Sequence, residues 1–181
     1  LDDPDPSLRQ IAANTLGVLG IDRAVDPLIE SLSDPNGEVR HWAAGSLGRL
    51  RAERAVAPLI LMLEETPGSA RHPAAVALGL IGSTEAVVPL IAALDEADPW
   101  TRAAVIYALG QLGDERAVDP LLAILGHDDP EIHVRRAIMV AFGQISSGRT
   151  AEALRSALED EDTEVRLYAE VALESLRTGR N

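Results

Sequence analysis

Apolar residues recur along the chain at the spacing that an amphipathic helix requires. In one stretch, Val39, Ala43, Leu47 and Leu50 lie at positions i, i+4, i+8 and i+11, which places them on one side of a helix. The pattern returns at five other places with an arginine at the same position, and we call these stretches B segments. Helices are predicted for the B segments near residues 7–20, 38–51, 69–82, 100–113, 133–146 and 164–177.

A shorter apolar stretch separates successive B segments and carries a proline. Pro27, Pro58, Pro89 and Pro120 are each 31 residues apart, and a constant period of this length indicates a repeat architecture. The residues around Pro27 read Ala-Val-Asp-Pro-Leu-Ile and return with few changes around the other three prolines. Short helices, which we call A segments, are predicted near residues 22–32, 53–64, 84–94, 115–125 and 149–158.

The A and B segments each have an apolar side that neither helix can bury alone, so successive pairs must stack on one another. One step between B segments, from 100–113 to 133–146, is 33 residues long, which places a two-residue insertion in loop 126–132. We therefore predict an all-α fold, a right-handed α-α superhelix of about five and a half repeats. It is expected to form one domain over residues 1–181.

Two further rows of residues follow the repeat. A glycine inside each of the first five B segments indicates that a neighbouring helix approaches closely, because glycine destabilises a helix interior by about 1 kcal/mol relative to alanine. An acidic residue six positions before each B-segment arginine is expected to cap that segment and to pair with arginine within or between repeats. The glycine row is Gly17, Gly48, Gly79, Gly110 and Gly143. The acid–arginine row is Asp3/Arg9, Asp34/Arg40, Glu65/Arg71, Glu96/Arg102, Asp129/Arg135 and Asp160/Arg166.

The two ends of the repeat array differ. In the last B segment, Glu170 takes the place of an apolar residue of the other B segments, and Glu174 takes the place of the row glycine. Because a carboxylate cannot be packed under a further repeat, these residues predict a polar C-terminal cap. At the other end, Leu1 aligns with Leu32, the last residue of an A segment, and the sequence does not begin with Met. We expect that the sequence is a piece of a longer protein or lacks its first helix.

The repeat resembles the short HEAT-like repeats named after phycobilin (PBS) lyases. The resemblance is carried by V-R-x-x-A-A-x-x-L-G-x-L, as in residues 39–50, followed by A-V-x-P-L-I, as in residues 55–60, and it covers essentially the whole chain. The 31-residue period is shorter than the roughly 40–47 residues of HEAT and armadillo units, and tetratricopeptide and ankyrin signatures are missing. Members of the resembled family are mostly binding scaffolds, and the resemblance implies that the B helices lie on the concave side.

Specificity is expected on the side of each B segment that lies opposite its apolar stripe. On a helical wheel this side holds Glu38, His41, Gly45 and Arg49, and the equivalent positions vary from repeat to repeat. The border of the same side holds Trp42. Variable outward positions on a constant scaffold are typical of a binding surface.

Aromatic residues gather on this outward side. Trp100 and Tyr107 lie seven residues apart on one B segment, with Val76 and Leu80 on one neighbouring segment and Val140 on the other. This arrangement predicts an apolar trough with aromatic anchors for a peptide, helix or protein partner. The candidate partner-binding residues are Trp42, His41, Arg49, His72, Val76, Leu80, Trp100, Tyr107, Gln111, Arg136, Val140, Gln144 and Tyr168.

Composition and charge narrow the classes of partner. Hydrophobic residues make up 46% of the chain and aromatic residues only 3%, so small and aliphatic side chains must fill the core, where Phe142 is the one aromatic residue expected. A net charge of −13 argues against a nucleic-acid or membrane partner, because phosphate binding needs clustered cations. The absence of cysteine excludes a disulfide framework and a thiolate site and is compatible with the cytoplasm. No apolar run approaches the roughly 20 residues of a membrane span.

Four histidines raise the question of a metal site. His41 and His72 occupy one row of successive B segments, but neighbouring helices lie about 8–10 Å apart and a site needs three or four ligands. The inserted loop from His127 to His133 gathers several possible ligands, and a metal site there is the alternative to an ordinary Asp-Pro capping turn. Deoxyhypusine hydroxylase also uses HEAT-like repeats, but its His-Glu dipeptides are missing. We expect no catalytic, cofactor-binding or metal-binding residues.

The sequence therefore predicts a non-enzymatic scaffold that binds a peptide or protein partner on the B-helix side. Two alternatives stay open. The resemblance also implies a phycobilin lyase or isomerase-like subunit, which would handle a tetrapyrrole together with a second HEAT-like chain. A regulatory repeat segment of a larger enzyme is the other alternative.

Overall fold

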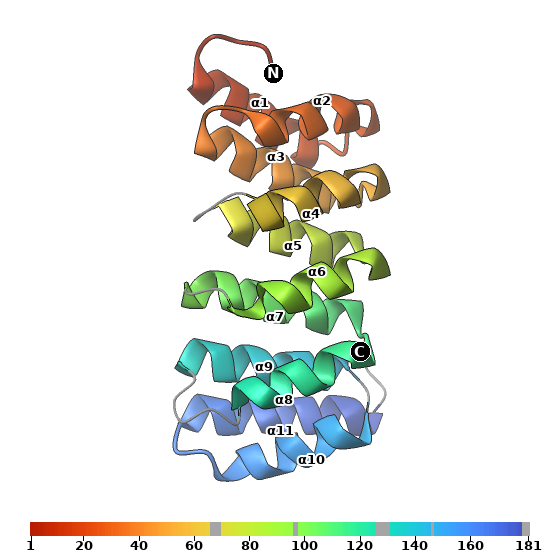
Figure 1. Ribbon diagram of the computed structural model, residues 1–181, viewed down its shortest axis with the longest axis vertical. Helices are drawn as coiled ribbons and strands as arrows, with labels where there is room; N and C mark the ends of the chain where they lie inside the picture. Colours follow the sequence, from red (N-terminus) through yellow and green to blue (C-terminus); the bar gives the residue numbers. More distant parts are fainter. Residues whose placement is uncertain (66–69, 96–97, 126–130, 146, 179–181) are drawn as a thin grey trace. The chain divides into compact units, whose positions relative to one another are not determined.

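A computed structural model of the chain describes residues 1–65, 70–95, 98–125, 131–145 and 147–178. Within these residues the chain forms helices and no strand, which confirms the predicted all-α fold (Figure 1). Contacts divide the chain into two compact units, unit 1 from Leu1 to Pro89 and unit 2 from Leu90 to Asn181. Each unit is a stack of helix pairs.

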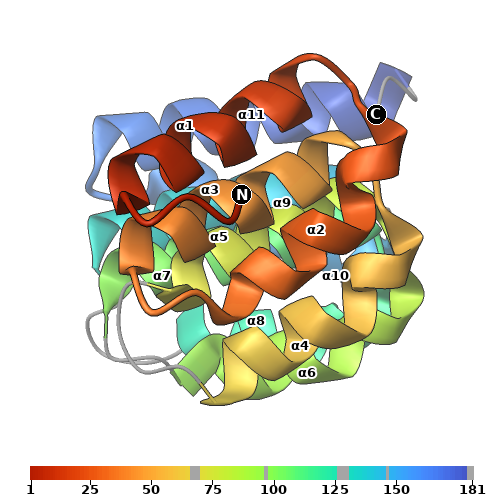
Figure 2. The ribbon, with the colours of Figure 1, turned by 90° about the horizontal axis from the view of Figure 1, so that it is seen from above.

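Unit 1 alternates B helices with shorter A helices. Its helices are α1 (Pro6–Val18), α2 (Val25–Glu30), α3 (Gly37–Arg49), α4 (Val56–Glu65) and α5 (Arg71–Ile81), and α6 (Val87–Ala92) crosses into unit 2. The B helices α1, α3 and α5 pack directly on one another, while α2 and α4 form a second layer (Figures 1 and 2). Each A helix contacts the B helix that follows it, α2 with α3 and α4 with α5.

Unit 2 repeats this arrangement. Its further helices are α7 (Pro99–Leu112), α8 (Val118–Leu125), α9 (Ile132–Gln144), α10 (Gly148–Ser156) and α11 (Thr163–Thr178). The B helices α7, α9 and α11 pack on one another in sequence order, and α8 and α10 contact α9 and α11. The B helices begin and end within two residues of the predicted bounds.

The A segments differ from the continuous helices that the sequence predicts. The segment predicted at 22–32 divides into a 3₁₀ turn at Asp22–Ala24, the α-helix α2 and a second 3₁₀ turn at Ser31–Ser33. Pro27 explains the first division, because it has no N–H to donate to the carbonyl four residues earlier and is tolerated only in the first turn of an α-helix. The α-helix therefore begins at Val25, two residues before the proline.

Close contact between B helices explains the glycine row. A Cβ atom added at Gly48 would lie 2.9 Å from the Cα of Ala77 on the next B helix, and one at Gly110 would lie 2.8 Å from the Cα of Ala141. Real Cβ atoms do not approach a backbone atom so closely, so only glycine fits. In the first pair Gly17 faces Ser46, whose buried hydroxyl donates a hydrogen bond of 2.8 Å to the carbonyl of Ala13.

A residue with positive φ follows several of the B helices. Gly82 and Gly113 follow α5 and α7 with φ values of 84° and 66°, a left-handed conformation that suits glycine. The equivalent residue after α3 is Arg51, which adopts the same region with φ 50°. The turn geometry is therefore imposed by the stacking of the repeats and not by glycine alone.

The acid–arginine row joins neighbouring repeats in unit 1. The Arg9 guanidinium donates two hydrogen bonds, of 2.7 and 2.9 Å, to the carboxylate of Asp34 in the next repeat, and both side chains are largely buried. The arginine of that next repeat, Arg40, instead donates a 2.7 Å hydrogen bond to the backbone carbonyl of Asp34. Asp34 is thus held by two arginines, one through its carboxylate and one through its backbone.

The predicted capping role of these acids was wrong in its detail. The side chain that caps α3 is Asn36, which accepts hydrogen bonds from the backbone N–H groups of Glu38 and Val39. The carboxylate of Asp34 accepts from the N–H of Asn36 and so shapes the turn before the cap. A carboxylate six residues before the arginine lies too far outside the helix to reach its first free N–H groups. Of the row, Glu96 and Asp129 fall outside the described residues, as does the side chain of Glu65.

The Asp34→Asn variant is expected to lower the free energy of unfolding at pH 7 by about 1–2 kcal/mol. The hydrogen bonds from Arg9 hold the pKa of the Asp34 carboxyl below its usual range. A carboxyl with a lowered folded pKa stabilises the native state above its unfolded pKa, and this contribution is lost as the pH falls through the folded pKa. When unfolding is measured at several pH values between 7 and 2, the free energy of unfolding of Asp34→Asn should therefore fall less than that of the wild type. Asp22→Asn, at an exposed aspartate, is the control. If the wild type and both variants lost the same stability at low pH, the Arg9–Asp34 pair would not be what stabilises the protein near neutral pH.

Candidate partner-binding face

The candidate residues of unit 1 lie on α3 and α5. His41 and Arg49 are exposed on α3, and Val76 and Leu80 are exposed on α5, as the helical wheel predicts. His72 is half-buried. The exposed Arg49 guanidinium donates a 3.3 Å hydrogen bond to the Asn14 side chain of α1, so this part of the face is polar at α1 and α3 and apolar at α5.

Trp42 lies at the border of the outward side of α3, as the helical wheel predicts, and it is half-buried. Its ring meets His41 edge to face, with centroids 5.5 Å apart. Its indole nitrogen is buried and, among the described residues, has no hydrogen-bond partner. Trp42 therefore contributes mainly packing in unit 1 and is less exposed than Trp100, Tyr107 and Tyr168 of unit 2.

Unit 2 carries a continuous set of outward side chains on three stacked B helices, which we call the aromatic face. Helix α7 supplies Trp100 and Tyr107, α9 the middle of the set, and α11 its far side. The aromatic face consists of Trp100, Tyr107, His133, Arg136, Val140, Tyr168 and Val171. Trp100, Tyr107 and Tyr168 keep 62%, 40% and 38% of their surface exposed, whereas Phe142 is fully buried, as predicted.

Trp100 and His133 form one end of the aromatic face. The two rings lie 4.3 Å apart between centroids, with planes inclined by 31°. Trp100 is the second residue of α7, whose first turn is held by the Asp98 side chain through the backbone N–H of Thr101 at 3.1 Å. His133 is likewise the second residue of α9. The stack thus presents a flat aromatic platform at the start of two neighbouring helices.

The middle of the face combines two tyrosines with a paired arginine. Partial burial raises the pKa of the Tyr107 hydroxyl, and nearby Tyr168 adds to the rise, while the positive charge of Arg136 opposes it. The Arg136 guanidinium lies 2.7 Å from the carboxylate of Glu164 on α11 and 3.4 Å from that of Asp162, just before α11. The Tyr107 phenol therefore stays neutral near pH 7 and can donate a hydrogen bond to a ligand.

A slot with a volume of about 240 Å³ opens between α9 and α11 at the other end of the face. At one point of its lining, Gly143 and Ala172 bring the two helices into close contact. Its lining residues are Val140, Gly143, Gln144, Tyr168, Val171, Ala172 and Ser175. The slot is mainly apolar, and it suits a hydrophobic side chain.

The structure adds residues that the sequence prediction did not select. His133 completes the platform with Trp100, and the repeat spacing could have shown this, because the two residues occupy the same position in successive B segments. Val171 borders the slot and is largely exposed. In contrast, Ala103 and Pro73 fall on or beside the outward side of the wheel but are buried. Val76 and Leu80, predicted to flank the trough, belong to unit 1.

The described residues contain no group of three or more His, Cys, Asp or Glu side chains that could hold a metal ion. His41 and His72 lie on different helices, α3 and α5. Residues 126–130 of the inserted loop, which include His127, Asp128 and Asp129, fall outside the described residues. Over the part of the chain that is described, no helix has the length and apolar character needed to cross a membrane.

A stack of helix pairs with a 31-residue repeat is the architecture of an α-solenoid repeat protein. HEAT repeats match residues 1–78 and 58–140, and the PBS lyase HEAT-like repeat matches residues 134–160. The chain belongs to the HEAT-repeat family. No curated protein has a matching sequence.

Several solved structures are similar to this chain. A chain in the complex of CpcE and CpcF of phycocyanin lyase from Nostoc sp. PCC7120 is 28% identical, with a TM-score of 0.74, and the match covers 85% of this chain and 65% of that chain. A designed armadillo repeat protein in complex with peptide (KR)4 is 20% identical with a TM-score of 0.72, covering 97% and 95% of the two chains. Human deoxyhypusine hydroxylase is 23% identical with a TM-score of 0.55, covering 98% and 82%. The last two likenesses concern the fold alone.

Proposed function

We propose that this protein is a non-enzymatic interaction scaffold that binds a peptide or protein partner on its B-helix side, with the aromatic face as the main contact. The observation that supports this most is the exposure of Trp100 and Tyr107 on α7 and of Tyr168 on α11, the two B helices of unit 2 that pack on either side of α9. Aromatic side chains are the strongest contributors to most protein interfaces when they become buried.

The composition of the core strengthens the proposal. The core of unit 2 is filled by alanine and aliphatic side chains together with Phe142. Aromatic side chains contribute strongly when they are buried, since each buries about 150–250 Å². Their grouping on one side of the surface instead favours a partner that covers them, because large exposed apolar patches mark interaction sites.

The geometry of the face fits a segment with separate anchors. One apolar side chain of the partner can enter the slot between α9 and α11, while another packs on the platform of Trp100 and His133. The hydroxyl groups of Tyr107 and Tyr168 lie on the same face and can bond to the polar backbone of the partner. Apolar anchors ringed by a few polar groups are typical of peptide sites.

The Trp100→Ala/Tyr107→Ala double variant tests the proposal. Peptides would be selected from a random phage-displayed library on the wild-type protein, and their affinities measured by calorimetry. Loss of two aromatic anchors is expected to weaken these peptides by at least about 30-fold, because a hot-spot side chain contributes about 2 kcal/mol or more. Circular dichroism would establish that the variant is folded.

Leu158→Ala provides the matched control, since Leu158 is 41% exposed in the same unit but lies outside the aromatic face. It should leave the affinities within a factor of about two. If no peptide binds the wild type, or if all selected peptides bind the folded double variant as well as the wild type, the proposed site is wrong.

A subunit with phycobilin lyase-like activity is the second candidate. It is favoured by the 28% identity to the chain in the phycocyanin lyase complex, although the match spans 65% of that chain. The absence of cysteine in this chain is compatible with it, because the reacting thiol would belong to the acceptor protein. Incubation with a bilin and an acceptor subunit, followed by visible absorption, separates this function from simple binding. A bilin-dependent covalent product would favour the lyase.

A further inference from the structure

The outward side of unit 1 has an open position that a side chain fills on the other B helices. Gly45 lies in the interior of α3, and a Cβ atom added there would meet nothing within 4 Å among the described residues. The glycines of the row are different, because a neighbouring helix requires them, as at Gly48. The residues that take the place of Gly45 on the other B helices are Asn14, Val76, Tyr107, Val140 and Val171.

Packing within unit 1 does not explain this glycine. Glycine destabilises the interior of a helix relative to alanine, and an alanine side chain at position 45 would meet no neighbouring atom of the described chain. Glycine is also the residue that lets another molecule approach a backbone closely. The open space at Gly45 is therefore what a ligand lying against the α3 backbone would require.

An arginine borders the open space on the side of α1. Arg49 lies one helical turn after Gly45 and is exposed. Its guanidinium donates a 3.3 Å hydrogen bond to the side-chain oxygen of Asn14, the residue of α1 that has the same repeat position as Gly45. The guanidinium therefore leans back from the end of α3 toward the open space.

No carboxylate among the described residues pairs with Arg49. In contrast, Arg136 on the outward side of unit 2 is paired with two carboxylates. Glu38 is an outward acid of α3, but it lies eleven residues before Arg49, or roughly 16 Å along the helix. The last turn of a helix also favours an arginine through the helix dipole. The charge alone therefore does not indicate a ligand, whereas its position beside Gly45 does.

Apolar side chains border the open space on the side of α5. Val76 has the repeat position of Gly45, and Leu80 has that of Arg49, and they keep 38% and 37% of their surface exposed. A methyl carbon of Leu80 leans toward α3, because it would lie 3.1 Å from a Cβ atom added at Gly48. We call the whole set the Gly45 site, which consists of Asn14, Gly45, Arg49, Val76 and Leu80.

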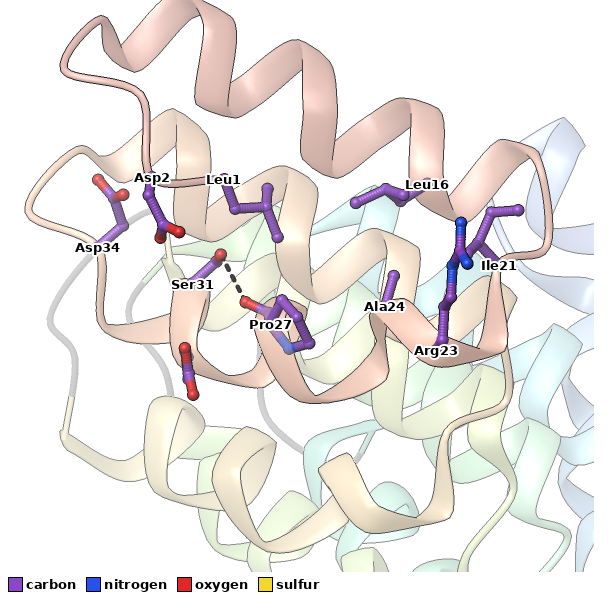
Figure 3. Close-up of a pocket in the computed structure, with 10 residues that line it drawn as sticks. Leu1, Asp2, Leu16, Ile21, Arg23, Ala24, Pro27, Ser31 and Asp34 are labelled. Atoms are coloured by element: carbon purple, nitrogen blue, oxygen red, sulfur yellow. Dashed lines mark hydrogen bonds between the residues drawn. The ribbon is translucent and has the colours of Figure 1, made fainter.

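A cavity with a volume of about 480 Å³ lies elsewhere in unit 1, between α1 and α2 (Figure 3). Pro27 and Ser31 line it, and the Ser31 hydroxyl donates a 2.8 Å hydrogen bond to the carbonyl of Pro27. Asp34 also lines it, and its carboxylate is bonded to Arg9. Because these polar groups already have partners, the cavity offers less chemistry for a ligand than the Gly45 site does.

We propose that the Gly45 site binds an apolar peptide segment that carries a single aspartate or glutamate. The carboxylate pairs with Arg49, the peptide backbone lies against Gly45, and a neighbouring apolar side chain packs on Val76 and Leu80. A tract of several acids does not fit, because the net charge of −13 repels it. This inference rests on the proposed function, since it names a kind of partner for the B-helix side, but it does not involve the aromatic face.

The test separates the Gly45 site from the aromatic face. Peptides would be selected from a random phage-displayed library on the full-length Trp100→Ala/Tyr107→Ala variant, then synthesised with an amidated and with a free C-terminus. The selected peptides should share one Asp or Glu beside an apolar residue. In calorimetry on the wild type, replacing this acid by the corresponding amide should weaken binding by about tenfold, because a charge-assisted hydrogen bond is lost.

Two substitutions in the chain locate the contact. Arg49→Gln should weaken the acidic peptide by about tenfold and change the amide form by less than about twofold, because the two losses share one interaction. Gly45→Leu should weaken both forms by at least about tenfold, because its side chain fills the open space. Urea denaturation should show that Gly45→Leu is at least as stable as the wild type, since leucine favours a helix more than glycine does.

Arg51→Gln is the matched control, because it removes an equal charge two residues after Arg49. It should change the affinity of the acidic peptide by less than about twofold. Equal losses in Arg49→Gln and Arg51→Gln would overturn the proposal, since the attraction would then be a general effect of charge.

The proposal is also wrong if the double variant selects no peptide, if the selected peptides share no acid, or if Gly45→Leu binds them as well as the wild type does. Binding only with a free C-terminus would show that a chain end, and not an acidic side chain, occupies the site, and the assignment would fail. If peptides selected on the wild type are lost on the double variant, and the double variant selects none, the aromatic face is upheld and the Gly45 site is not.

Discussion

Replacing Gly48 by valine is expected to lower the free energy of unfolding by about 3 kcal/mol. The added Cβ would lie 2.9 Å from the backbone Cα of Ala77 and 3.1 Å from a methyl carbon of Leu80. A backbone atom in a packed helix cannot move aside by rotating a bond, so α3 and α5 would have to separate. Urea denaturation followed by circular dichroism measures the loss directly.

Gly45→Ala is the matched control, because Gly45 lies in the same helix and an added Cβ would meet nothing within 4 Å among the described residues. Here alanine should raise the free energy of unfolding by up to about 1 kcal/mol, since it orders the helix at no steric cost. If both variants changed stability in the same direction, close helix contact would not be the reason for glycine at position 48.

The Phe142→Ala variant is expected to lower the free energy of unfolding by about 3–5 kcal/mol. Phe142 is fully buried on α9 and is the only aromatic residue in the core of the described chain. Removing its ring leaves a cavity between helices whose other core residues are mainly alanine and aliphatic side chains, and these cannot fill it. The measurement is again urea denaturation, with the m-value checked against that of the wild type.

Phe142→Leu distinguishes the loss of volume from the loss of an aromatic ring. Leucine stands at the same repeat position in α3, α5 and α7, as Leu47, Leu78 and Leu109, and each is fully buried. The leucine variant should therefore lose less than about 1.5 kcal/mol. A leucine variant as unstable as the alanine variant would mean that the cavity around Phe142 is shaped for the ring itself.

Much of the fold could be predicted because the repeat presents each signal several times. The apolar spacing around Val39 and Leu47 predicts α3 within two residues of its observed ends, and the same spacing predicts the other B helices. The divided A helices were not predicted, since the effect of Pro27 depends on where the first backbone hydrogen bonds form. A pattern of side chains shows which residues share a face of a helix. It does not show which backbone N–H group donates a hydrogen bond to which carbonyl.

The candidate face could be predicted in part. The helical wheel places Trp100, Tyr107 and Tyr168 on or beside one side, and the structure exposes all three. The wheel also places Ala103 on that side, yet it is buried by its neighbours. The slot between α9 and α11 was not predicted, because a cavity depends on how far apart two helices lie and on which side chains are missing between them.

The sequence by itself determined that the chain is an α-helical repeat protein, that its B helices must meet at glycine, and that its aromatic residues lie mainly outside the core. These properties follow from periodicity and residue size, which are local and repeat with the sequence. Only the tertiary structure decided that Arg9 pairs with Asp34 of the next repeat and that Trp100 stacks on His133. Each of these depends on distances between residues about 30 positions apart, which stacking of the repeats sets and sequence spacing alone does not.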